Sequence, residues 1–350
     1  MEDPIVVNIE LSDDDPETFQ ANVISLIKEI HKDLSDSETN SIQLEKPTRG
    51  LMNRTYCLKV NGVSKKMVLR INGKNTEEYM DRDFEYFALC FLSKISLAPK
   101  VLLKFKNGMI SEFCSGKELT PEKIANYSMS KKIAVHLAYL HKIDIEKVPE
   151  IAEREPFILK NMKRYYNTTP KKYSRKEIQE QFDSYFGTKN IEKNISEISS
   201  VIEKDCRPMF ALGHNDLVVG NFLHDEVEDK IQLIDFEFAE KNFKQSDIAN
   251  FFLGSVVTSP NADYYRTFSP EGRRNFVKMY LEEYKFSGEE LEKELDIWMK
   301  ELPIFEAAGH LIWCFWALFQ AEHSPRAFDF IGYAIHKHMA FESLFENKDN

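Results

Sequence analysis

The sequence contains few of the residues that interrupt or cross-link a chain. Only 13 glycines and 13 prolines occur among 350 residues, which excludes a collagenous or low-complexity protein. The five cysteines are odd in number and widely spaced, and no two form a CxxC metal or redox motif. We expect them to be small, buried residues in a reducing compartment.

Positive charge is also in short supply. Lys and Arg number 46 against 57 Asp and Glu, so the formal net charge is −11. A chain with this balance has no global basic field to attract nucleic acid or an anionic membrane, although a local basic cleft is compatible with it. We therefore predict no nucleic-acid partner.

Long apolar runs are absent as well. The most apolar stretch, residues 307–321, is interrupted by His310 and Gln320 and is shorter than the roughly 20 residues of a membrane helix. We predict a core helix there and no membrane insertion. The acidic N-terminus has no basic region before an apolar core, unlike a secretory or mitochondrial leader. The predicted location is cytoplasmic.

The hydrophobic pattern divides the chain into three parts. Residues 1–18 are acidic and are predicted to form a loose tail, although a helix is expected from Pro16 to about Leu34. Residues 19–116 are predicted to form a small α+β lobe. Its expected elements are strands at 55–60 and 66–71 around an Asn61-Gly62 turn, a helix at 83–95, and strands at 101–106 and 109–113.

Residues 117–350 are predicted to form a larger, mainly helical lobe, with the boundary between Phe113 and Thr120. The exception to the helical pattern is a loop and β-hairpin over residues 210–238. This exception contains the polar residues of greatest chemical interest.

Within that segment, His214–Asp216 is followed by Asn221, and Asp235 comes at the end of the apolar run 231–234. A charge at this place is costly unless it has a role. Phosphoryl transfer requires a carboxylate that accepts the proton of the attacking hydroxyl, and oxygen ligands for Mg²⁺. Oxygen ligands suit Mg²⁺ rather than zinc. The pattern therefore favours a Mg²⁺-dependent phosphotransferase.

These residues resemble the choline/ethanolamine kinase family, a branch of the protein-kinase-like and aminoglycoside-phosphotransferase-like folds. The resemblance runs from about residue 47 to about residue 345. It is carried by HNDxxxxN and by IDFEF, which is followed by Asn242, Asp247 and Asn250. It implies an α+β, bilobal protein-kinase-like fold, with a small antiparallel-sheet N-lobe and a large, mainly helical C-lobe.

The resemblance also implies roles for these residues. Asp216 is expected to be the catalytic base, and Asn221 and Asp235 are expected to be ligands of Mg²⁺. His214 is expected to brace the loop, and Asp247 and Asn250 the hairpin. Glu237 is expected to support the same site.

On the nucleotide side the chain has no GxGxxG. Residues 48–53 resemble the family's shorter Gly/Ser/Asn loop, in which Asn53 would contact phosphate, although such a loop alone is usually an ordinary turn. Arg70 stands where protein kinases have a lysine, and its guanidinium fork suits phosphate oxygens of ATP. Glu85 is expected to pair with Arg70. The residues expected near adenine are Glu112 and Cys114.

On the substrate side, Trp313 and Trp316 are three residues apart and share a helix face. With Phe328, Tyr333 and Phe238 they resemble the aromatic box in which this family holds a quaternary ammonium, a cation that ring faces attract. Without the resemblance, aromatics at helical spacing are more often simply core.

Three positions depart from the pattern of many choline kinases. Val218 replaces Gln, Phe238 replaces Tyr and Gly254 replaces Glu. These departures remove hydrogen-bond acceptors that a primary ammonium needs, which narrowly favours choline. The segment 328–335 resembles ethanolamine kinases in detail, so ethanolamine as the main substrate stays open.

The sequence thus predicts ATP- and Mg²⁺-dependent phosphorylation of choline to phosphocholine, the first step of the CDP-choline (Kennedy) route, with ethanolamine as a second substrate. The family implies a cytosolic enzyme that is often a homodimer. One alternative is an aminoglycoside-type kinase, but the paired tryptophans Trp313 and Trp316 make it less favoured. Another alternative is an inactive regulatory partner, but the presence of Asp216, Asn221 and Asp235 makes it less favoured.

Overall fold

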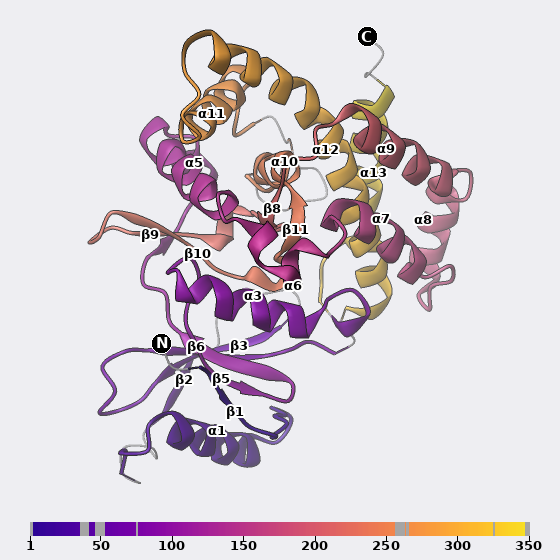
Figure 1. Cartoon of the computed structure of the whole chain (residues 1–350). Coiled ribbons are helices and arrows are strands. Elements are labelled where there is room, and N and C mark those ends of the chain that lie inside the picture. The colour runs from indigo at the N-terminus through magenta and orange to yellow at the C-terminus, as the bar shows by residue number, and fades with distance from the viewer. Residues whose placement is uncertain are drawn as a thin grey trace. The chain divides into compact units, whose positions relative to one another are not determined.

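The computed structural model describes residues 3–35, 42–45, 53–74, 76–255, 263, 266–324 and 326–346, and Figure 1 shows their course. The chain divides into two compact units. The first comprises Met1–Gly116 and Gln232–Phe236, and the second comprises Lys117–Ile231 and Glu237–Asn350. The short segment 232–236 is therefore separated in sequence from the rest of its unit.

The first unit is built on a six-stranded sheet with the order β1-β5-β6-β4-β3-β2. All neighbouring strands are antiparallel except the edge pair β1 and β5, which is parallel. The predicted antiparallel sheet is thus confirmed apart from this edge. The strands are β1 (Ile5–Val6), β2 (Gln43–Glu45), β3 (Arg54–Lys59), β4 (Met67–Ile71), β5 (Val101–Phe105) and β6 (Gly108–Glu112).

Alternating side chains direct one face of this sheet to a core. On β4, Met67, Leu69 and Ile71 are buried, while Arg70 between them is on the other face and part-exposed. Helix α1 (Pro16–Ile30) adds an apolar stripe to the same core. Helix α3 (Arg82–Lys94) begins at Asp81, whose carboxylate accepts from the Phe84 N–H at 3.0 Å.

The acidic N-terminal residues are not the loose tail expected from their composition. β1 pairs with β5, and Leu11 is almost completely buried in the core of the unit. The side chain of Asn107 bonds both the N–H (2.9 Å) and the carbonyl (2.8 Å) of Leu11. Asp13 pairs with Arg54. The segment is ordered because its apolar residues complete the sheet, which a count of its acids does not reveal.

The second unit is mainly helical, as predicted. Its helices are α4 (Pro121–Ile124), α5 (Tyr127–His141), α6 (Pro149–Ala152), α7 (Phe157–Thr168), α8 (Lys176–Phe186), α9 (Ile191–Asp205), α10 (Lys244–Gly254), α11 (Pro270–Glu282), α12 (Gly288–His323) and α13 (Phe330–Glu346).

The predicted core helix is the C-terminal half of α12, which packs along α13 (Figure 1). Among the described residues, α12 is the one helix long and apolar enough to cross a membrane, but most of that apolar stretch is buried inside the protein. Burial by neighbouring helices is what a core helix requires, so the expectation is confirmed.

Two small sheets interrupt the helices. One has the order β10-β9-β7 and contains the predicted hairpin, and the other is the antiparallel pair β11-β8. The pairing of β8 with β11 is not predicted from the sequence. The strands are β7 (Lys117–Glu118), β8 (Phe210–Gly213), β9 (Phe222–Asp225), β10 (Lys230–Leu233) and β11 (Glu240–Phe243).

Candidate active site

The 214–221 loop, which joins β8 to β9, carries the predicted base Asp216. Its first turn depends on Asn215, whose φ of 64° lies in the left-handed region that asparagine tolerates better than most residues. The Asn215 side-chain nitrogen donates to the Phe238 carbonyl (2.9 Å), and its oxygen accepts from the Asn242 amide (2.7 Å). The loop is thereby fastened on one side immediately before Asp216.

Helix α10 holds the main chain of the same loop. Asp247 accepts from the backbone N–H groups of His214 (2.9 Å) and Asn215 (2.7 Å). Asn250 accepts from the backbone N–H of Leu217 at 2.6 Å. The sequence predicts that Asp247 and Asn250 brace the hairpin, whereas in the structure they accept hydrogen bonds from the main chain of the 214–221 loop. Being three residues apart, they act from one face of α10.

A buried histidine from α5 contacts Asp247 in turn. His141 Nε2 lies 2.9 Å from Asp247 Oδ2, and His141 Nδ1 lies 2.9 Å from the Tyr280 hydroxyl. Burial on its own would raise the pKa of Asp247, but hydrogen bonds and charge from His141 and His214 hold it below the usual value. His141 and Tyr280 are not predicted from the sequence, because a histidine at the end of an apolar helix gives no sign of its distant partners.

Asp216 is the carboxylate that this loop presents. The Asn221 side-chain nitrogen donates to the Asp216 backbone carbonyl (2.9 Å) and to its carboxylate (3.3 Å). Burial and the Glu237 carboxylate raise the pKa of Asp216 to about 7, against the effect of the Asn221 bond. A general base works best with a pKa near the operating pH, so Asp216 suits proton removal from a hydroxyl.

His214 and Glu237, the other predicted supporting residues, are both buried beside Asp216. His214 Nδ1 accepts from the backbone N–H of Asp216 at 3.3 Å, in keeping with the predicted bracing role. Glu237 acts through its charge, which disfavours a second carboxylate nearby and so helps raise the Asp216 pKa.

The predicted substrate-binding aromatics lie in one continuous row of ring contacts in the second unit. Phe330, not predicted as a member, links its two halves. The rings of each neighbouring pair meet edge-on, as aromatic pairs prefer. The centroid distances are 5.5 Å for Phe238–Trp313, 5.8 Å for Trp313–Trp316, 5.8 Å for Trp316–Phe330, 4.8 Å for Phe328–Phe330 and 5.7 Å for Phe328–Tyr333.

Two polar groups belong to this aromatic row. The buried indole nitrogen of Trp316 has no hydrogen-bond partner among the described residues, so it can donate to a bound oxygen. The Lys337 ammonium lies 5.2 Å from the centre of the Tyr333 ring, and its side chain is buried. Burial lowers the pKa of Lys337 to about 7. Lys337 is not among the site residues predicted from the sequence.

In the first unit, Arg70 lies between two carboxylates. It forms an ion pair with Glu85 of α3, as predicted, and its Nη1 lies 3.8 Å from Asp235 Oδ1. Arg82 also donates to Glu85, at 2.8 Å. Burial on its own would raise the pKa of Glu85, but the two arginines hold it below its usual value. Arg82 is a member of this cluster that the sequence does not predict.

The predicted phosphate loop lies mostly outside the described residues, apart from Asn53. The Asn53 side-chain oxygen accepts from Arg82 (3.1 Å) and from the Gly73 N–H (3.3 Å). Asn53 thus joins the cluster of Arg70 and Glu85 through Arg82. A contact of Asn53 with phosphate stays a prediction.

The predicted adenine-contacting residues lie at the end of β6. The Glu112 N–H donates to the Lys100 carbonyl (2.9 Å), and the Phe113 N–H donates to the Lys66 carbonyl (3.2 Å). The backbone N–H groups of Glu112 and Phe113 are therefore already engaged in hydrogen bonds within the protein. A backbone donor for adenine in this segment falls to Cys114, and the adenine contact itself stays a prediction.

The predicted Mg²⁺ ligands have the chemistry of a hard-cation site. Mg²⁺ typically takes only one or two protein oxygens and completes its shell with water and phosphates. Asn221 donates through its amide nitrogen, which leaves the amide oxygen for coordination. The Asp235 side chain is 40% exposed and so is open to a ligand. Among the described residues no group of three or more His, Cys, Asp or Glu could hold a metal, and the binding of Mg²⁺ stays a prediction.

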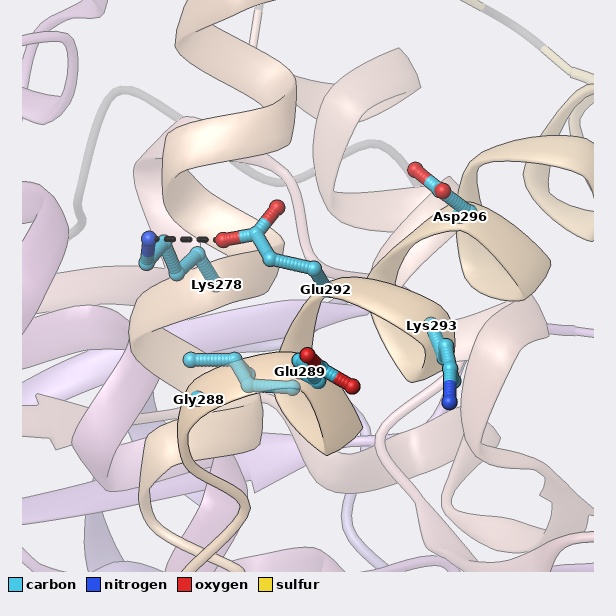
Figure 2. A pocket seen from close by; sticks show the side chains of 7 residues that line it. Lys278, Gly288, Glu289, Glu292, Lys293 and Asp296 are labelled. Carbon is cyan, nitrogen blue, oxygen red and sulfur yellow. Dashed lines mark hydrogen bonds and ion pairs between the residues drawn. The ribbon is translucent and has the colours of Figure 1, made fainter.

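A separate surface hollow of about 560 Å³ lies at the start of α12 (Figure 2). Three of its charged side chains pair with neighbours: Lys278 donates to Glu292 at 2.9 Å, and Arg274 binds both Glu292 and Asp296. None of the predicted site residues lines this hollow. The hollow is therefore not part of the predicted site.

The chain was also compared with known proteins. The choline/ethanolamine kinase family model matches residues 44–342. Ethanolamine kinase 1 of Homo sapiens is 29% identical, over 98% of this chain and 75% of that protein. A probable ethanolamine kinase of Arabidopsis thaliana is 28% identical, over 89% of this chain and 82% of that protein.

Two solved structures are also similar. An ethanolamine kinase of Plasmodium vivax has a TM-score of 0.81 at 26% identity, and the match covers 96% of this chain and 91% of that one. A choline kinase of Cryptosporidium parvum has a TM-score of 0.71 at 21% identity, over 95% and 96% of the two chains, and this likeness shows the fold. The kinase-like fold predicted from the sequence is confirmed.

Proposed function

The chain belongs to the choline/ethanolamine kinase family, and we propose that it transfers the terminal phosphoryl group of ATP to the hydroxyl of a small amino alcohol. The arrangement around Asp216 carries this proposal. Its raised pKa, its bond from Asn221 and the α10 side chains that hold its loop give a positioned base. Phosphoryl transfer asks a protein mainly for positioning and charge stabilisation.

In the proposed reaction, Asp216 accepts the proton of the substrate hydroxyl while the hydroxyl oxygen forms a bond to the γ-phosphorus. The bond from that phosphorus to the bridging oxygen of ADP breaks, and the proton later leaves Asp216 for solvent. The products are a phosphorylated amino alcohol and ADP. The 214–221 loop contributes by keeping the carboxylate in place for this transfer.

We propose that Asn221 and Asp235 hold Mg²⁺, which when bound neutralises charge on the phosphates. Arg70 supplies a guanidinium for phosphate oxygens, and its pairing with Glu85 orients it. Asn53 and the segment around Glu112 and Cys114 are proposed for phosphate and adenine. These roles rest on the family and on the chemistry of each side chain.

Separate observations support ethanolamine and choline as the main substrate. The curated relatives named above are ethanolamine kinases, which supports ethanolamine. The loss of acceptors at Val218 and Gly254 supports choline. Ring faces attract either ammonium. We propose ethanolamine as the main substrate and choline as a second one, in place of the narrow preference for choline drawn from the sequence.

The two alternatives receive less support. The continuous aromatic row from Phe238 to Tyr333 is suited to a single small ammonium rather than to a polycationic aminoglycoside. An inactive partner has no need of a base with a raised pKa. The cytoplasmic location, the homodimer and the lipid-synthesis route stay predictions from the sequence and the family.

The test is to incubate the purified protein with ATP and Mg²⁺ and to follow ADP release with ethanolamine, choline or kanamycin. We expect release with both amino alcohols, a higher kcat/KM for ethanolamine, and none above the ATPase blank with kanamycin. No release with either amino alcohol contradicts the proposed activity. A higher kcat/KM for choline contradicts only the substrate preference.

A further inference from the structure

Gly254, the last residue of α10, lies against the main chain of the 214–221 loop. A Cβ atom built on Gly254 overlaps the carbonyl oxygen of Leu217 and lies 2.9 Å from the Cα of Val218. Real Cβ atoms essentially never come within 3.0 Å of such neighbours. These neighbours are backbone atoms, so no side-chain rotation relieves the overlap. Glycine alone lets the loop lie this close to α10.

Gly254 is the third residue on one face of α10 that contacts the 214–221 loop. Asp247, Asn250 and Gly254 are spaced i, i+3 and i+7, the spacing of residues on one helix face. Asp247 bonds the loop before Asp216, and Asn250 bonds Leu217 directly after it. Gly254 then sets how closely the chain at Leu217 approaches the helix. The backbone on both sides of Asp216 is thus held against α10.

We propose that Gly254 is a positioning residue for Asp216: its missing side chain sets the depth at which the 214–221 loop sits on α10. The inference rests on the proposed phosphotransfer, in which Asp216 is the base. A larger residue at 254 pushes the loop outward and stretches the 2.6 Å bond between Leu217 and Asn250. Even a small displacement of a group that takes part in the reaction lowers the rate by a large factor.

The proposal also links two departures from the family pattern. The sequence alone treats Val218 and Gly254 as two separate losses of a polar side chain. In the structure, the backbone of Val218 lies where a side chain on residue 254 would begin. The glutamate that many choline kinases carry at this position therefore cannot simply be restored here. The two views give opposite expectations for a Gly254→Glu variant.

Two other helical glycines of the second unit serve as matched controls. A Cβ on Gly272 of α11 meets no atom closer than 3.5 Å, which is ordinary contact. A Cβ on Gly309 of α12 meets only the end of the Leu253 side chain, at 3.0 Å, and that atom can move. Both controls make the same chemical change, and both gain the higher helix propensity of alanine.

The experiment measures kcat and the KM values for ATP and ethanolamine in Gly254→Ala, Gly254→Glu, Gly272→Ala and Gly309→Ala, with circular dichroism of each. We expect kcat to fall about tenfold or more in both Gly254 variants, with the ATP KM within about twofold of wild type. The Gly272 and Gly309 variants should keep kcat within about twofold. Amide exchange at Leu217 should be faster in Gly254→Ala, while α10 stays protected.

Each other outcome contradicts the inference. An unchanged kcat in Gly254→Ala, or a gain in ethanolamine kcat/KM in Gly254→Glu, means that the loop does not depend on this contact. Loss of the helical signal in Gly254→Ala assigns the glycine to overall folding instead. Wild-type protein that turns over neither amino alcohol contradicts the proposed function, a result distinct from all of these.

Discussion

At the scale of single residues, the chemistry depends on carboxylates and cations whose surroundings shift their pKa values. Asp216 and Lys337 both have pKa values near 7, for related reasons. Burial disfavours the charged form of each, and for Asp216 the Glu237 carboxylate adds to this effect. Neither shift can be predicted from the sequence, because burial, the main cause of each, is not visible there.

The base assignment gives the first prediction. Asp216→Asn keeps the size of the side chain but replaces the carboxylate with an amide, which cannot accept the proton. We expect kcat for either amino alcohol to fall by about 10²–10⁴-fold, as for loss of a general base. ADP release measures the effect, and the circular dichroism spectrum should match wild type. Retention of full kcat would rule out Asp216 as the base.

Lys337 gives a prediction about stability and pH. Its folded pKa of about 7 lies below that of the unfolded chain, so the unfolded state binds the extra proton between about pH 7 and pH 10. Wild-type stability should therefore rise with pH across that window, because of this group. Lys337→Met removes the cost of burying an ammonium and should add about 2–5 kcal/mol to the unfolding free energy at pH 7.

The measurement is urea unfolding of Lys337→Met and wild type at several pH values. The difference between them should shrink as the pH rises toward 10 and should be constant below about pH 6. Lys293→Met, at an exposed lysine of α12, is the control and should show little change at any pH. A gain that is the same at every pH would contradict the burial explanation.

At the scale of elements, the site depends on two helices. α10 holds the 214–221 loop through its bonds to the main chain, and α12 carries both tryptophans of the aromatic row. The helical pattern of α12 predicts its existence, and the three-residue spacing predicts that Trp313 and Trp316 share a face. The pattern cannot predict that Phe330 links them to Phe328, because that contact depends on how α13 packs.

The aromatic row leads to a prediction about substrate binding. Trp316→Phe removes part of the ring surface and the indole N–H that has no partner among the described residues. We expect the KM for ethanolamine or choline to rise about threefold to thirtyfold, as for loss of about 0.5–2 kcal/mol of cation–π attraction. The KM for ATP should stay within about twofold.

The control for this variant is the third tryptophan, on the same helix. Trp298 is fully buried and donates to Glu294 at 2.9 Å, away from the aromatic row. Trp298→Phe should lower stability while leaving the amino-alcohol KM unchanged. If both variants raise the KM for ATP and for the amino alcohol equally, the aromatic row does not bind the substrate.

Much of the fold could be predicted from the sequence, because the relevant signals are local. The β3–β4 hairpin and helix α3 follow from alternation, a turn at Asn61-Gly62 and helical spacing. The pairing of β8 with β11 and the bond between His141 and Asp247 could not be predicted. These join residues far apart in the chain, and nothing in either segment alone names its partner.

At the scale of the whole molecule, the acidic composition has a less simple meaning than the sequence indicated. The net charge is −11, and the acids of residues 1–18 contribute to it in a segment that the sequence predicts to be a loose tail. That segment contributes β1 and the buried Leu11 to the first unit, and Asp13 pairs with Arg54. Its acids therefore belong to a folded unit. Their number alone could not reveal this, because a few apolar residues decide the packing.

Removal of this segment gives the last prediction. Deletion of residues 1–12 removes β1 and exposes the cavity left by Leu11, so the unfolding free energy should fall by about 2–3 kcal/mol. Thermal unfolding measures the change. Deletion of residues 1–4 keeps β1 and Leu11 and is the control, with little expected change. Equal melting temperatures for the two deletions would mean that the segment does not support the unit.

The membership of residues 232–236 in the first unit has a consequence for synthesis on the ribosome. Asp235, which lies 3.8 Å from Arg70, is translated more than a hundred residues after β6, the last strand in the sequence of the six-stranded sheet of that unit. The N-terminal unit therefore emerges incomplete and stays so until residue 236 has left the exit tunnel. A truncated fragment ending at Gly116 should for the same reason lack the Asp235 carboxylate, which lies 3.8 Å from Arg70 Nη1 in the whole chain. We therefore expect completion of the first unit during synthesis to wait until residues 117–231 of the second unit have been translated.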